Sequence, residues 1–219
     1  MQTDELIQRL VADTGAVRRL KSPWWRAIAW LALALPYVAV VAWVHLASFD
    51  AVAVVADPRF MIEQAAGLAT ALTAAFAAFA SVVPGFDRRA LLLPLAPLAL
   101  WLASIGQGCV EDWLQLGPDG LSVRPDWDCL PAALIIGAVP AAVLFVMLRR
   151  GAPLHPRVSL ALAALAVAAV SNLGMQVFHF RDASVMLLVW HLGGMAAISL
   201  VAGSLGGRVL RWRHAKGVR

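Results

Sequence analysis

The chain has 219 residues, of which 61% are hydrophobic and 14% are charged, and its net charge is +5. Soluble domains usually carry about a quarter of charged residues, and a core alone cannot absorb this much Ala, Val and Leu. The composition therefore excludes an ordinary soluble domain and indicates a membrane protein.

Residues 1–25 form a polar N-terminal segment that contains one short predicted helix. Thr3 can cap this helix, and Asp4 and Glu5 stand in its first turn, where acidic groups stabilise a helix. The apolar residues that follow repeat at positions i, i+1, i+4 and i+5, which gives the helix one apolar face. This face consists of Leu6, Ile7, Leu10 and Val11.

A helix of about ten residues is marginal alone in water, so the apolar face needs a partner. One candidate is the membrane surface, with Arg18, Arg19 and Lys21 on anionic headgroups. The other is a groove in a cytoplasmic protein. The acidic first turn makes pure lipid binding less attractive.

Six apolar runs follow, each close to the ~20 residues that a membrane-spanning helix needs. They cover residues 26–47, 62–83, 89–107, 129–148, 157–177 and 184–205. In lipid, every backbone polar group must be satisfied within its own segment, so the runs are predicted to be helices. We expect an all-α polytopic protein: a six-helix transmembrane bundle over 26–206 and a basic tail over 207–219.

Most of the 18 Lys and Arg residues lie before the first run, in two alternate turns and in the tail. Basic residues collect in cytoplasmic segments, so we expect both termini in the cytoplasm. Most of the acids lie in the other loops, on the outer side. This topology predicts a multi-pass protein of the bacterial inner membrane, with the lipid bilayer as one partner.

The only two cysteines, Cys109 and Cys129, bracket the polar loop 108–129, in "GQGCVEDWLQLGPDGLSVRPDWDCL". The predicted topology puts this loop in the oxidising periplasm. Three interpretations compete for the pair. It is a structural disulfide, worth roughly 3 kcal/mol for a loop of this length, a redox switch, or a pair of soft metal ligands.

Polar neighbours bear on these interpretations. Glu111, Asp112 and Asp128 disfavour a charged thiolate, which argues against unusually reactive thiols. His191, in "MLLVWHLGG", either makes an interhelical hydrogen bond or acts as a ligand or proton-sensitive group near the loop. The candidate metal ligands are therefore Cys109, Cys129 and His191, and no cofactor is expected.

Polar residues inside the runs are few and fall on the outer half, among them Glu63, Gln64, Gln107 and Gln176. We expect no charged residue in the cytoplasmic half, which weakens a pump or channel interpretation. No repeat suggests a transporter's duplicated halves. A membrane thiol oxidoreductase would need a Cys-x-x-Cys pair, which the chain lacks.

Several pieces of the sequence resemble the NrsF family, six-helix inner-membrane anti-sigma factors of proteobacteria. They are "TDELIQRLVAD", "VPGFDRRALLLPLAPLALWLASIGQGCVEDW", "DWDC" and "DASVMLLVWHLG". The resemblance implies a non-enzymatic protein that holds an extracytoplasmic-function sigma factor, of the sigma F type, inactive at the membrane. Oxidant or heavy-metal stress releases the sigma factor, which then binds RNA polymerase.

Paired cysteines are implicated in that response in the family, and in this chain they correspond to Cys109 and Cys129. Asp112, Asp128 and His191 are the polar residues placed to support them. The surface for the sigma factor is inferred from the N-terminal segment itself, and no direct contact with nucleic acid is expected. Its candidate residues are Asp4, Leu6, Ile7, Leu10, Val11, Arg18 and Arg19.

Overall fold

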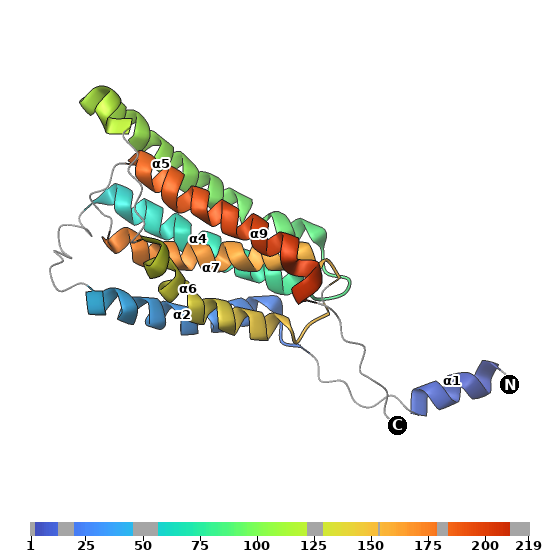
Figure 1. Cartoon of the computed structure of the whole chain (residues 1–219). Helices are drawn as coiled ribbons and strands as arrows, with labels where there is room; N and C mark the ends of the chain where they lie inside the picture. Colours follow the sequence, from blue (N-terminus) through green and yellow to red (C-terminus); the bar gives the residue numbers. More distant parts are fainter. Residues whose placement is uncertain are drawn as a thin grey trace.

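The computed structural model describes residues 3–12, 20–45, 57–121, 129–152, 154–178 and 184–210, and every regular element in these ranges is helical (Figure 1). A short helix, α1 (Thr3–Ala12), precedes the bundle. The next five helices are α2 (Pro23–His45), α4 (Pro58–Ala80), α5 (Leu95–Leu116), α6 (Cys129–Leu148) and α7 (Pro156–Phe178). The last one joins α8 (Ser184–Met186), a π segment η3 (Leu187–Leu192) and α9 (Gly193–Val209).

Six of these helices are long and apolar enough to cross a bilayer. Their backbone groups are satisfied within each helix, which is the condition for spanning lipid. The prediction of an all-α protein with six membrane-spanning segments is confirmed. The side of the membrane on which the termini lie stays a prediction.

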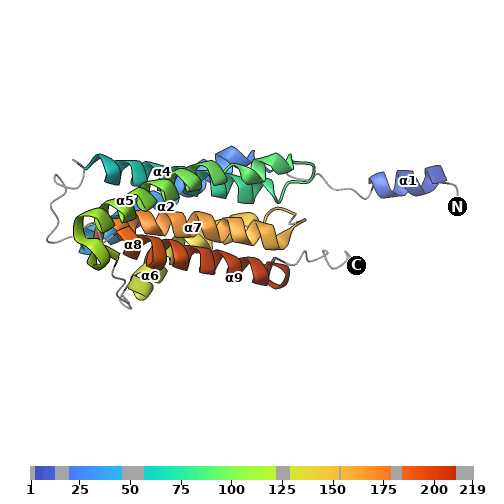
Figure 2. The same ribbon diagram turned by 90° about the horizontal axis from the view of Figure 1, so that it is seen from above.

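Helices α4 and α7 lie between the other spans, with α5 and α9 on one side and α2 and α6 on the other (Figure 1). Seen from above, α4 runs along one edge of the bundle and α7 lies beside α9 (Figure 2). About half of each apolar span is buried, 50% in α4 and 56% in α7, against 17–28% in the other four. Both central helices present small residues to their neighbours, such as Gly67, Ala74 and Ala166. Small side chains let helices approach closely in a membrane, where apolar burial alone gives no driving force.

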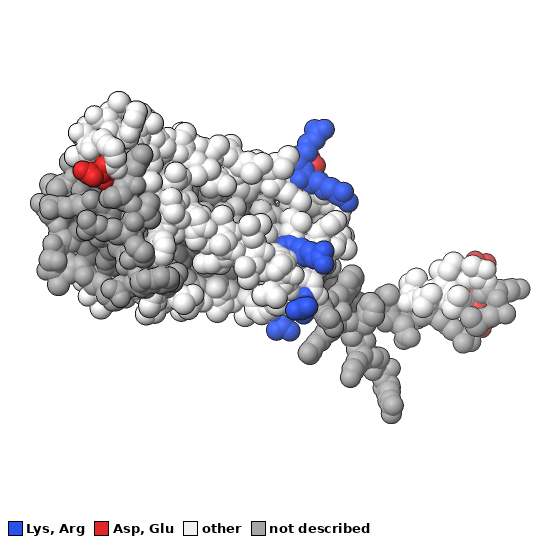
Figure 3. Space-filling model, turned by 45° about the horizontal axis from the view of Figure 1, so that its top comes forward, with Lys and Arg blue, Asp and Glu red and all other residues white. Residues whose placement is uncertain are grey.

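The two ends of the bundle differ in charge (Figure 3). The basic end carries the exposed residues Arg88, Arg89, Arg149, Arg150, Arg157 and Arg208. The acidic end carries Asp57, Glu63, Glu111, Asp112 and Asp119. Figure 1 draws α1 apart from the bundle, on the side of the basic end.

The sequence led us to expect no charged residue within the half of the bundle that ends in the basic residues. This expectation is wrong, because Arg26 lies there. Its side chain is buried, donates a hydrogen bond to the Met147 carbonyl oxygen and lies 4.3 Å from the centre of the Phe79 ring. The reason is that α2 begins at Pro23, since proline suits the first position of a helix. Arg26 therefore falls within the first turn of α2, between α4 and α6, rather than at the first position of the run expected at 26–47.

Helix α5 is displaced along the chain from the expected run at 89–107. A 3-10 turn, η1 (Arg88–Leu92), comes first, with the Asp87 carboxylate accepting a hydrogen bond from the Arg89 backbone N–H at 2.9 Å. The helix then continues past Gly106 and Gly108 to Leu116 and ends at Gly117. Gly117 adopts φ +63°, which glycine tolerates. Another 3-10 turn, η2 (Gly117–Leu121), follows, so Cys109 lies inside α5.

Gly206 of α9 packs directly on the chain that enters α7. A Cβ at this position would overlap the Pro156 carbonyl oxygen and lie 2.7 Å from the Arg157 Cα. These are backbone atoms, which cannot turn aside as a flexible side chain can. The contact therefore requires glycine and holds α9 against the start of α7.

We predict that Gly206→Ala destabilises the protein by about 1–3 kcal/mol, the usual cost of overpacking. Thermal unfolding of the purified protein in detergent measures the effect as a lower Tm. The matched control is Gly207→Ala, because a Cβ at Gly207 meets nothing within 4 Å. Equal Tm values for the two variants would contradict the close packing of α9 on α7.

Candidate functional site

The first turn of α4 sets up a polar cluster at the acidic end. Asp57 caps the helix, with its carboxylate accepting a hydrogen bond from the Arg59 backbone N–H at 2.9 Å, and Pro58 follows the cap. This start places Arg59 and Glu63 one turn apart on the same face. The Arg59 Nε donates to Glu63 Oε1 at 3.1 Å.

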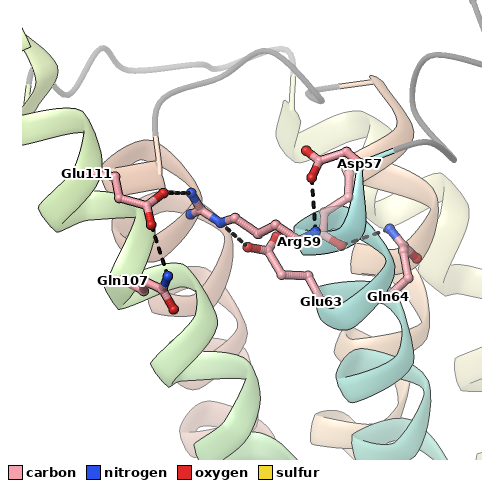
Figure 4. Close-up of polar contacts among 7 residues, drawn as sticks. Asp57, Arg59, Glu63, Gln64, Gln107 and Glu111 are labelled. Carbon is pink, nitrogen blue, oxygen red and sulfur yellow. Dashed lines mark hydrogen bonds and ion pairs between the residues drawn. The ribbon is translucent and has the colours of Figure 1, made fainter. Parts of the chain in front are cut away.

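Arg59 also reaches across to α5 (Figure 4). Its Nη1 lies 3.5 Å from Glu111 Oε2, and the Gln107 amide donates to the other Glu111 oxygen at 2.9 Å. Glu111 is partly exposed, whereas the Glu63 side chain is nearly covered. The guanidinium therefore joins a buried carboxylate of α4 to a partly exposed carboxylate of α5.

Glu63 is held from a third helix as well. The Gln176 side-chain Nε2 of α7 donates to Glu63 Oε2 at 3.2 Å, and the Gln64 Nε2 donates to the Gln176 side-chain Oε1 at 2.8 Å. A buried carboxylate is costly unless it is paired and hydrogen-bonded. Here Arg59 and Gln176 meet that requirement, and in doing so they connect α4, α5 and α7.

The Arg59 guanidinium lies against Gly108 of α5. A Cβ at position 108 would overlap the Arg59 guanidinium, so the Arg59 side chain would have to move if any residue other than glycine stood there. The next residue is Cys109, a half-buried free thiol that packs against the core. Asp112, Arg59 and Glu63 lie close enough for their charges to act on this thiol.

The structure places only some of the residues predicted from the sequence. Cys109 and Asp112 lie within one turn of each other on α5, beside the cluster. Cys129 begins α6 and His191 lies in the π segment, but their side chains are outside the described part, as are all of Asp128, Arg18 and Arg19. The predicted grouping of Cys109, Cys129 and His191 therefore stays a prediction.

The predicted metal site consists of the same three side chains, Cys109, Cys129 and His191. Within the described residues, no three or more His, Cys, Asp or Glu side chains are grouped so as to hold a metal ion.

Sequence reasoning did not identify Arg59 and Gly108 as a pair. Arg59 precedes the apolar run expected at 62–83, and Gly108 is the first residue of the polar loop expected at 108–129. One local signal was available: "DPR" has the form of an N-cap followed by proline at the first helical position. Such a start brings Arg59 into α4, but no sequence spacing relates it to Gly108.

At the other end of the chain, α1 forms the amphipathic helix expected from its pattern. Asp4 and Glu5 lie in its first turn. The apolar face is open to solvent, with exposures between 41% for Leu6 and 65% for Val11. A short helix with an uncovered apolar face is suited to contact with another surface.

Together, the fold and these two regions define a multi-pass helical membrane protein with a polar cluster between its helices and an exposed amphipathic helix. The sequence model of the NrsF family, described as negative regulator of sigma F, matches residues 10–212. The match spans nearly the whole chain, so the protein belongs to the NrsF family. The family implies a sigma factor as the partner and fits a regulatory rather than an enzymatic role. No curated protein and no solved structure shows a significant match.

We predict that Gln176→Leu destabilises the protein by about 1–3 kcal/mol for each buried polar group left without a partner. The substitution removes the donor to Glu63 and the acceptor for Gln64. Thermal unfolding in detergent provides the measurement. Gln107→Leu is the control, because among the described residues the Gln107 amide bonds only to the half-exposed Glu111. The Tm of this variant should stay close to that of the unmodified protein. Equal losses in both variants would mean that Glu63 does not depend on α7.

Proposed function

We propose that this protein is a membrane-bound anti-sigma factor that sequesters an extracytoplasmic-function sigma factor of the sigma F type. On periplasmic stress, from an oxidant or a heavy metal, it releases the sigma factor. The observation that carries this proposal is the family match over residues 10–212. The protein is proposed to act in the bacterial inner membrane and to make no direct contact with nucleic acid.

The charge distribution supports an orientation for this function. Basic residues favour the cytoplasmic side of a membrane protein. The exposed arginines of the basic end, such as Arg89 and Arg150, would therefore face the cytoplasm. The N-terminal segment and the basic tail 207–219 would then lie where a sigma factor is found, and the acidic end would face the periplasm.

The proposed contact with the sigma factor is α1. Its face of Leu6, Ile7, Leu10 and Val11 is exposed, and a helix this short gains stability from laying that face in a groove. Asp4, in the first turn, adds a negative charge that favours a basic rim on the partner. Arg18 and Arg19 are proposed to assist, on the partner or on nearby anionic lipid.

The proposed sensor is the pair Cys109 and Cys129. Cys109 lies on α5, beside charged residues that also contact α4 and α7. Oxidation or metal ligation at the pair would change how α5 sits relative to α6, where Cys129 begins the helix. A signal acts only through different free energies for the retaining and releasing states. Asp112, Asp128 and His191 would tune that difference.

We predict that Leu10→Asp abolishes most retention of the sigma factor, because it puts a charge in the centre of the apolar face. Co-purification from membranes, with the sigma factor detected by mass spectrometry, measures retention. Gln8→Asp is the matched control: it adds the same charge on the opposite side of α1. Retention by Leu10→Asp equal to that by Gln8→Asp would remove α1 from the interface.

We also predict that the double variant Cys109→Ser, Cys129→Ser no longer responds to oxidant or heavy metal. A sigma-dependent reporter in living cells provides the measurement, with the level of protein in the membrane as the control. The physical reason is that serine cannot form a disulfide and is a poor ligand for soft metals. An unchanged stress response would exclude the cysteines from sensing.

A further inference from the structure

The contact between Arg59 and Gly108 joins two helices in an unusual way. The guanidinium occupies the space that any side chain at position 108 would need. Arg59 belongs to α4, yet its guanidinium lies over the backbone of α5 at Gly108, next to the Glu111 carboxylate. The contact of the Arg59 guanidinium with Gly108, which we call the seat, therefore joins α4 to α5 at the acidic end, in addition to the packing of Trp101 against Gly67.

Among the described residues, two carboxylates hold the Arg59 guanidinium over Gly108. Glu63 holds it from α4 at 3.1 Å, and Glu111 holds it from α5 at 3.5 Å. Gly108 and Glu111 are three residues apart, so both lie on the α5 face that meets α4. The buried Glu63 side chain is in turn fixed by Gln176 of α7. The seat is therefore tied to the central helices α4 and α7.

We propose that Arg59, seated on Gly108, is the positioning residue that holds the thiol-bearing helix α5 in the arrangement that retains the sigma factor. This inference rests on the proposed function and names how that function is regulated. In the structure Cys109 is a free thiol. The seat is formed in that state.

The position of Cys109 explains how a signal reaches the seat. Cys109 follows Gly108 directly, so a rotation or shift of α5 that accompanies a change at the thiol also moves Gly108. Moving Gly108 disturbs the guanidinium and, through it, Glu63 and Gln176. Conversely, a side chain added at position 108 displaces Arg59 without altering the thiol. The seat can therefore be broken without any signal.

The test compares Gly108→Ala with Gly106→Ala. Both variants add one methyl group to the same helix, two residues apart, and both gain the same helix propensity. A Cβ at Gly106 meets nothing within 4 Å, whereas one at Gly108 overlaps Arg59. A difference between the two variants therefore reports the seat and not a general effect of alanine.

Two readouts are used, both normalised to the amount of protein in the membrane. The first is a sigma-dependent reporter over a range of oxidant concentrations. We expect Gly108→Ala to raise the output of unstressed cells several-fold and to lower the oxidant concentration for half-maximal response. The second is the rate at which a membrane-impermeant maleimide labels Cys109, measured with Cys129→Ser in all variants. We expect a several-fold faster rate for Gly108→Ala, while Gly106→Ala matches the parent in both readouts.

A double-mutant cycle links the effect to Arg59. Arg59→Ala should have at least the effect of Gly108→Ala, because it also removes the ion pairs with Glu63 and Glu111. Adding Gly108→Ala to Arg59→Ala should change nothing further, because the guanidinium that the new Cβ would displace is then absent. Additive effects would overturn the proposal. So would a Gly108→Ala variant that matches Gly106→Ala, or one that retains the sigma factor more strongly.

Further variants keep the test decisive if Gly108→Ala does not accumulate in the membrane. Glu111→Gln weakens one side of the seat without adding volume, and a parent-like result for it in both readouts would overturn the proposal. If the parent protein retains no sigma factor, the proposed function fails, and the labelling rate alone then decides whether Arg59 positions α5. The two failures are thus distinguishable.

Discussion

The arrangement of the acidic end depends on compensating one buried carboxylate. Glu63 lies inside an apolar bundle, where an unpaired charge would be very costly. Its two oxygens take donors from Arg59 and from Gln176, and Arg59 also engages Glu111. The contacts that stabilise this one carboxylate thereby connect α4, α5 and α7. Loss of Arg59 would affect the contact with α5 and the pairing of Glu63 within α4.

The central pair of helices is joined at both ends, unlike α5. At the acidic end Gln64 and Gln176 connect α4 to α7, and at the basic end the Ser81 and Ser159 hydroxyls lie 2.7 Å apart. Small residues fill the interface between them, so the pair packs closely along its length. Helix α5 packs on α4 of this pair rather than on α7. A shift of α5 would therefore leave the interface between α4 and α7 in place.

The sequence was sufficient for the six spans and for α1, because apolar length and helical periodicity are local properties. It located the start of α6 at Cys129 but ended the preceding helix too early, since nothing in a hydropathy pattern marks Gly117 as the stop. The sequence did not indicate the contact between Arg59 and Gly108. The two residues belong to different helices, and a period along one helix says nothing of its neighbour.

Helix α5 with its flanking 3-10 turns is the longest of the six candidate spans and runs from Arg88 to Asp119. Its uncharged part is shorter: it extends from Ala90 to Val110, close to the ~20 residues that a bilayer crossing needs. Glu111 and Asp112 follow at once, so we expect the last turns of α5 to extend beyond the hydrocarbon. Cys109 lies at the end of the uncharged part, where lipid gives way to water. A thiol at this depth is within reach of reagents dissolved in water, although the helix that carries it crosses the membrane.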